Sequence, residues 1–123
     1  MQVEDPMILC MTPCPKPRMT RSDKWQKRPA VMRYWAFCEE LRIRLPRDYD
    51  LIDKHVHFIL PMPSSWSEKK KVMMDGQPHT QRPDLSNLLK SLEDAHQAED
   101  NTIHRYRSLS KAWGRAGAII LNK

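Results

Sequence analysis

The sequence has no long uncharged apolar run. None of its apolar stretches approaches the roughly 20 residues that a helix needs to cross a bilayer. The first residues also lack a basic segment that leads into a long apolar one, which is the pattern of a secretory signal. A membrane-spanning protein is excluded, and we expect this protein to stay in the cytoplasm without a membrane partner.

Cysteine is scarce and lacks the spacing of a redox or zinc motif. The count of three is odd, and Cys10 and Cys14 lie four positions apart with Pro13 between them. This spacing fits neither a CxxC pair nor a four-ligand zinc set. The five histidines are scattered, and no two stand at the spacing of a zinc-protease helix. We therefore expect reduced, mostly packed thiols and no zinc site.

The chain is too short for two cores. Its 123 residues fit one compact domain of about 100 to 150 residues, and its apolar fraction of 40% can fill a modest core. No internal repeat or low-complexity tract is present. We expect a single domain over residues 1–123, with residues 1–6 as a flexible N-terminal extension.

The net charge is +6, which favours a phosphate backbone or another anionic surface as partner. Two segments carry much of the basic charge, residues 15–28 and residues 62–82, and their proline and turn residues predict loops for both. The basic residues that we expect to contact DNA are Lys16, Arg18, Arg21, Lys24, Lys27, Lys69, Lys70, Lys71 and Arg82.

The sign of the charge reverses over residues 83–100, where five acidic residues face a single lysine, Lys90. Carboxylates repel DNA phosphates and weaken the counterion release that drives binding, so a protein that only grips DNA gains nothing from them. Hydrated Mg²⁺ is a hard cation that carboxylate oxygens hold. Basic flanks around an acidic centre therefore favour a nuclease, although an amphipathic helix with a solvated acidic face has the same composition.

The apolar periodicity predicts an α+β fold, a single compact domain in which two main helices pack against a mixed β-sheet. The expected order is β-α-β-α-β-β, with Trp35 in the core. The expected strands are 7–11, 55–60, 102–110 and 118–121, and the expected helices are 29–45 and 84–95.

The second helix carries its leucines on one face and a polar ridge of Asp84, Asn87, Lys90 and Asp94 on the other, at 100° per residue. Asp84 can cap the helix or bind a metal ion, and both roles can coexist. Lys90 is either a solvated lysine or a group that reaches a scissile phosphate. A ligand at position 86 would require residues 84–86 to be extended.

An acidic pair, Glu99 and Asp100, follows this helix in the expected turn before the next strand. Such a pair is often a plain turn signal. If that strand packs beside the start of the helix, Asp100 meets Asp84, and two close carboxylates call for a cation between them. Metal-assisted hydrolysis of a phosphodiester then becomes feasible.

The segments RPDLSNLLKSLEDA, EDNTI and KAWG, with PCPKPRMTR near the N-terminus, resemble the RusA family of Holliday-junction endonucleases over roughly residues 8–121. The resemblance implies that Asp84 and Asp100 are catalytic metal ligands, that Lys90 is the catalytic lysine, and that Asn87 matches the motif asparagine. Asp94 and Glu99 are further candidate ligands, and Ser86 stands where the family has an aspartate.

By the same resemblance, the chain is a homodimer that uses Mg²⁺ or Mn²⁺ to cut four-way DNA junctions in recombination and repair, encoded by a phage or prophage. Two other readings stay open. One is a non-catalytic junction-binding protein that lost a metal ligand at Ser86. The other is a protein-interaction module anchored by Trp25, Trp35 and Trp66, although Trp25 and Trp66 could also stack on unpaired bases.

Overall fold

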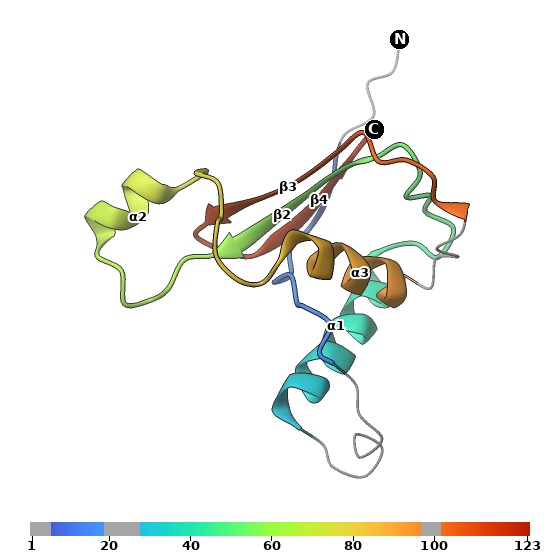
Figure 1. The fold of residues 1–123 in the computed structure, drawn as a ribbon, viewed down its shortest axis with the longest axis horizontal. Helices are drawn as coiled ribbons and strands as arrows, with labels where there is room; N and C mark the ends of the chain where they lie inside the picture. The colour runs from blue at the N-terminus through green and yellow to red at the C-terminus, as the bar shows by residue number, and fades with distance from the viewer. Residues whose placement is uncertain (1–5, 19–27, 97–101) are drawn as a thin grey trace.

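The computed structural model describes residues 6–18, 28–96 and 102–123 of the chain. Within these ranges the helices and strands follow the order β1 (Met7–Leu9), α1 (Pro29–Arg44), β2 (His55–Pro61), α2 (Glu68–Met74), α3 (Leu85–Ala95), β3 (Ser108–Gly114) and β4 (Ala118–Asn122) (Figure 1). The expected α+β class is confirmed, with a mixed sheet and helices in one domain.

The four strands form one sheet in the order β1-β4-β2-β3. β2 lies inside the sheet, paired with β3 on one edge and β4 on the other, and its alternating residues Val56, Phe58 and Leu60 are buried on one face. β3 pairs parallel to β2, with His55 opposite Ser108, while β4 pairs antiparallel to both β2 and β1. The parallel pair forms between strands separated by α2 and α3, which together provide the long crossover that such pairing needs.

α1 and α3 cover the same face of the sheet (Figure 1). α3 begins after Pro83 and packs its buried face, which includes Leu88, Leu92 and Ala95, into the core. α1 begins at Pro29, where the missing amide proton costs nothing, and buries Val31 and Leu41 completely. Burial of these side chains stabilises the layer by about 1.5–3 kcal/mol for each large aliphatic residue. None of the helices in the described ranges is long and apolar enough to cross a membrane.

The last part of the sheet corrects the sequence prediction. A strand was expected over residues 102–110, but β3 runs from Ser108 to Gly114, and the described residues before it are irregular. The apolar residues Ile103, Tyr106 and Leu109 pack against the core at a spacing of three, which a two-residue strand period does not fit. The short strand β1 likewise ends at Leu9 rather than at Met11.

Trp35 is also placed differently from the prediction, because 41% of its surface is exposed. The buried stripe of α1 passes through Tyr34, Cys38 and Leu41, and a step of 100° from Tyr34 moves Trp35 to its margin. The prediction that Trp35 belongs to the core is therefore wrong.

The basic segment 62–82 was expected to be a loop, but it contains α2. Ser67 caps this helix, since its hydroxyl accepts a hydrogen bond of 3.2 Å from the amide of Lys70. No residue of α2 is buried, so no apolar period in the sequence could reveal the helix. Figure 1 shows α2 standing apart from α1 and α3, beyond the end of β2.

Candidate nuclease site

Asp84 stands immediately before α3, in an extended conformation with φ −66° and ψ 145°. Its side chain makes no hydrogen bond to the helix amides, and the residue is exposed. The first turn is instead closed by backbone bonds of 3.1 Å from the amides of Asn87 and Leu88 to the Asp84 carbonyl. A purely capping role does not describe this residue, and its carboxylate oxygens stay available to a ligand.

A cavity of about 520 Å³ opens beside this helix start. Its lining residues are Pro15, Arg82, Pro83, Asp84 and Asn87. The cavity therefore brings together a carboxylate, an amide and a guanidinium, three groups that the sequence had named for separate reasons. An anionic substrate that enters it meets the cation of Arg82 beside the oxygen donors of Asp84 and Asn87.

Lys111 fixes the segment that leads into Asp84. Its side-chain ammonium, which extends from β3, donates hydrogen bonds of 2.5 Å to the Gln81 carbonyl and 2.7 Å to the Pro83 carbonyl. The sequence analysis did not assign Lys111 to the site, although it belongs to the KAWG segment. The period of two within a strand was the signal that could have found it. Lys111 pairs with the buried residue Phe58 of β2, so its side chain points to the face of the sheet that the helices cover.

Asp94 lies near the other end of α3 and is already paired. Its carboxylate accepts a hydrogen bond of 2.6 Å from the Lys16 ammonium, and both side chains are about three-quarters buried. This ion pair ties the N-terminal segment to α3. Lys16, which was predicted to contact DNA, and Asp94, which was a candidate metal ligand, therefore neutralise each other.

The remaining candidates of α3 lie on its outer surface. Ser86 is the second helical residue and is exposed, as is Lys90 one turn further on. Because only Asp84 is extended, the structure lacks the extended 84–86 segment that a ligand at Ser86 would require. Glu93 accepts a hydrogen bond of 3.0 Å from the Tyr106 hydroxyl.

Several predicted site residues lie outside the described ranges. These are Glu99 and Asp100 of the acidic pair, Arg21, Lys24 and Lys27 of the first basic segment, and Trp25. Within the described ranges, no group of three or more acidic, histidine or cysteine side chains comes close enough to hold a metal ion. Asp84 and Asn87 still fit a hard cation, because both present oxygen donors at one cavity and Asp84 has no cap bond.

The second basic segment contains α2, which lies beyond the end of β2 (Figure 1). Lys69 and Lys70 are exposed on α2, and Lys71 is half-buried. Trp66 is half-buried against Trp113, with ring centroids 4.8 Å apart, and Lys70 lies 4.2 Å from the Trp66 ring. The contact between Trp66 and Trp113 thus anchors α2 to β3.

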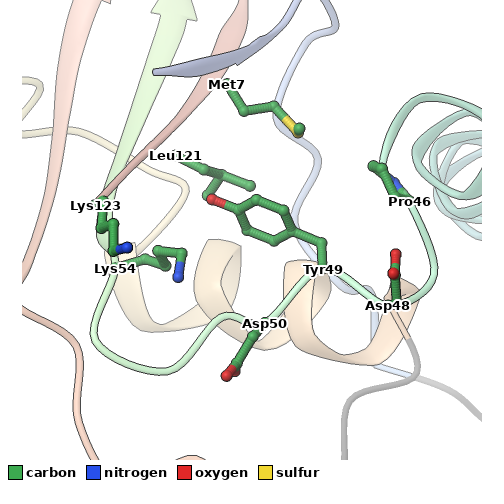
Figure 2. Close-up of a pocket in the computed structure, with 8 residues that line it drawn as sticks. All are labelled: Met7, Pro46, Asp48, Tyr49, Asp50, Lys54, Leu121 and Lys123. Atoms are coloured by element: carbon green, nitrogen blue, oxygen red, sulfur yellow. The ribbon is translucent and has the colours of Figure 1, made fainter. Parts of the chain in front are cut away.

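A second cavity, of about 480 Å³, shares no residue with the first (Figure 2). Tyr49 extends into it beside Met7 and Leu121, while Lys54 lies 5.5 Å from the Tyr49 ring (Figure 2). Asp48 and Asp50 stand on the loop below. None of the predicted site residues lies here, so this cavity does not compete with the Asp84 cavity as the candidate site.

Fold and site together define a small basic α+β protein with a cavity of mixed charge, in which the Asp84 carboxylate lies beside Arg82 and Asn87. Residues 12–115 match the family model described as Endodeoxyribonuclease RusA. The chain belongs to the RusA family of endodeoxyribonucleases, as the sequence motifs predicted. Comparison with curated proteins and with solved structures gives no match.

Proposed function

We propose that this protein is a metal-dependent endonuclease that cuts four-way DNA junctions. The observation that carries the proposal is the uncapped Asp84 carboxylate, which borders a cavity together with Asn87 and Arg82 in a chain of the RusA family. A carboxylate at a helix start normally caps that helix. The exposed Asp84 carboxylate is suited to bind a cation, and the Arg82 guanidinium in the same cavity is suited to bind a phosphate.

In this proposal Asp84 and Asp100 hold Mg²⁺ or Mn²⁺, with Asn87 as a neutral oxygen donor and Glu99 as a further candidate. A metal ion held there would supply a water of lowered pKa for attack on the phosphodiester. Lys90 and Arg82 bind the phosphate and stabilise the charge that develops on its oxygens. Lys111 keeps the Asp84 carboxylate in position through the Gln81 and Pro83 carbonyls.

The basic residues on both sides of the site bind the DNA arms. Lys69 and Lys70 project from α2, and Arg18 is exposed on the N-terminal segment, so these groups reach phosphates without unfolding the core. We further propose a homodimer, because resolving a junction takes two symmetric cuts. The activity places the protein in DNA recombination and repair in the cytoplasm, and a phage or prophage genome is the proposed source.

A second candidate is a protein that binds junctions without cutting them. Two observations favour it. Ser86 offers a neutral hydroxyl where the family has a carboxylate, and the Asp94 carboxylate is occupied by Lys16. Both reduce the number of charged ligands that are available to a metal ion.

One experiment separates the two candidates. The full chain is incubated with a synthetic four-way junction, a linear duplex and a single strand, with and without Mg²⁺. We expect cutting of the junction only with Mg²⁺. Asp84→Asn should abolish cutting and leave junction binding intact or slightly tighter, since it removes a ligand and a repulsive charge together.

The matched control is Asp48→Asn, which changes an exposed aspartate at the second cavity and should cut at the wild-type rate. Junction binding without cutting at any Mg²⁺ concentration would support the non-catalytic candidate. An Asp84→Asn variant that cuts as fast as the wild type would remove Asp84 from the proposed site.

A further inference from the structure

The outer side of α2 is apolar, although this helix carries three lysines. Val72 is 65% exposed and Met73 is 67% exposed, so two adjacent large apolar side chains lie in water. At 100° per residue, Lys69 lies between them around the helix axis. The two half-buried residues of the helix, Lys71 and Met74, lie on the opposite side. We call Val72 and Met73 the apolar pair.

This orientation is the reverse of an ordinary surface helix, which turns its apolar side inward. Single exposed apolar residues are common on proteins and need no explanation. The apolar pair differs from them because it forms one continuous apolar surface on a helix that stands apart from α1 and α3 (Figure 1). Such a surface is suited to bury itself against a binding partner.

The segment that carries α2 is bonded to β3 at both of its ends. Before the helix, the amide of Met62 donates a hydrogen bond of 2.9 Å to the Gly114 carbonyl. After the helix, the Gly76 amide donates one of 2.9 Å to the Trp113 carbonyl, and the Trp113 amide donates one of 3.0 Å to the Gln77 carbonyl. The apolar pair is therefore held in place before binding, which lowers the entropy that binding costs.

The charges around the apolar pair indicate the chemistry of this partner. Lys69 lies within the same exposed side, and Lys70 lies next to it, 4.2 Å from the Trp66 ring. Lysines bind phosphates, whereas apolar side chains find their contacts on the faces of bases. A chain of an endodeoxyribonuclease family that presents both groups together therefore fits DNA whose base faces are accessible.

Base faces are accessible where stacking is interrupted. In a continuous duplex each base pair is covered by its neighbours, and separating them costs a few kcal/mol for each step. The cost is lowest where pairing or stacking is already disturbed, as at a branch point. An apolar side chain that packs there gains contact at a lower cost than it would in a linear duplex.

We infer that the apolar pair of α2 is a wedge that packs against the base pairs at the branch point of a DNA junction. The wedge makes the protein favour branched DNA over linear duplex, while Lys69 binds a neighbouring phosphate. The inference rests on the junction-cutting function proposed above and names the residues that select its substrate. It assigns selection to α2 and leaves cleavage with the Asp84 cavity.

The test replaces the apolar pair with polar side chains of similar size in the full-length protein. The double variant Val72→Thr, Met73→Gln is compared with Ile43→Thr, Met32→Gln, which makes matched changes at residues 84% and 43% exposed on α1. Dissociation constants for a synthetic four-way junction and a linear duplex are measured without divalent ion, so that no strand is cut. A 2-aminopurine at the branch point reports unstacking by its fluorescence, and circular dichroism follows folding.

We expect the wild type and the α1 control to bind the junction more tightly than the duplex. The α2 variant should lower the ratio of the two dissociation constants about 10-fold, because two apolar side chains lose their burial. The slope of log binding constant against log salt should stay at the wild-type value, since no ion pair is removed. The 2-aminopurine fluorescence should rise with the wild type and not with the α2 variant.

An α2 variant that keeps the wild-type ratio, or a wild type that binds junction and duplex equally, overturns the inference. A lower molar mass of this variant in sedimentation equilibrium, with the ratio unchanged, would assign the apolar pair to a protein contact instead. A wild type that selects junctions through the apolar pair but cuts none refutes the proposed nuclease and leaves the wedge assigned. Cutting of junctions by a wild type whose preference does not depend on this pair has the opposite meaning.

Discussion

Lys111 shows how a single side chain can hold the segment that leads into Asp84. Its ammonium bonds to two carbonyls in the segment before Asp84, and the second of them, Pro83, is the residue joined to Asp84. The residue lies on β3, the strand that α3 contacts. The position of Asp84 is therefore coupled to the sheet as well as to the helix, whose first amides bond to the Asp84 carbonyl.

We predict that Lys111→Met lowers the rate of junction cleavage while leaving junction affinity within a small factor of the wild type. Loss of two hydrogen bonds from a charged donor should also reduce the free energy of unfolding by about 2 kcal/mol. Single-turnover rates, binding titrations and urea unfolding measure the three quantities. Lys111→Arg, which keeps the charge and the donors, should recover part of the rate.

The control for Lys111 is Lys54→Met, which removes a lysine that lies over the Tyr49 ring at the second cavity. It should cut at the wild-type rate. Cleavage by Lys111→Met at the wild-type rate would show that Asp84 holds its position without this tether.

At the scale of whole elements, α2 is the least integrated helix. It buries no residue of its own, and it is held by the Trp66–Trp113 contact and by an ion pair of 2.5 Å from Arg115 to Glu68. That ion pair lowers the pKa of Glu68 through its hydrogen bond with Arg115. A helix anchored at its first turn with lysines exposed beyond it is suited to contact DNA.

We predict that the triple change Lys69→Glu, Lys70→Glu and Lys71→Glu weakens junction binding without unfolding the protein. If all three lysines neutralise phosphates, the slope of log binding constant against log salt should become shallower by about 0.9 for each lysine replaced. The measurement is a binding titration at several salt concentrations, with circular dichroism as the check on folding.

A triple variant of equal charge change provides the control. Arg44, Arg47 and Lys123, changed together to Glu, lie outside the basic segments, and Lys123 follows the end of β4 farthest from α2. This variant should lose less affinity than the α2 variant. Equal losses would mean that net charge, and not α2, governs binding.

An element could be predicted from the sequence when its buried residues form a regular pattern. β2, α1 and α3 were predicted correctly because their buried residues repeat at periods of two or about 3.6. α2 buries nothing, so its sequence shows only charge. β3 was predicted over residues 102–110, whereas its pairing with β2 extends it from Ser108 to Gly114, a non-local contact that no local pattern reveals.

For the site, the sequence identified Asp84 and Asn87, which the structure brings to one cavity. It could not reveal that the Asp84 side chain leaves the helix uncapped, since that depends on backbone angles at one residue. It also could not pair Lys16 with Asp94, because the two are 78 positions apart and meet only through the packing of the N-terminal segment on α3.

At the scale of the whole molecule, charge is segregated by surface. The basic side chains of α2 and the mixed cavity at Asp84 lie on different parts of one small domain. In the proposed function, DNA binding at α2 and cleavage at the Asp84 cavity therefore do not compete for the same residues.

Folding of the whole domain should also respond to pH through one buried residue. His79 is only 5% exposed, its ring centroid is 4.2 Å from that of Trp113, and its Nδ1 atom has no hydrogen-bond partner. Burial lowers the pKa of His79 below its ordinary value of 6.5, and the nearby Lys111 charge lowers it further. The folded protein therefore favours the neutral imidazole.

The unfolded chain binds a proton at this residue more readily than the folded chain does. The resulting stability is fully present above about pH 6.5, the unfolded pKa, and it is lost as the pH falls toward the lowered folded value. We predict that His79→Phe, which keeps a ring against Trp113 but cannot titrate, loses less stability on acidification. Urea unfolding at fixed protein concentration, at several pH values on both sides of this range, measures the difference. It should reach at most about 1.4 kcal/mol for each pH unit. His104→Gln, at an exposed histidine, should follow the wild type, and parallel curves for His79→Phe and the wild type would exclude His79 as the coupled group.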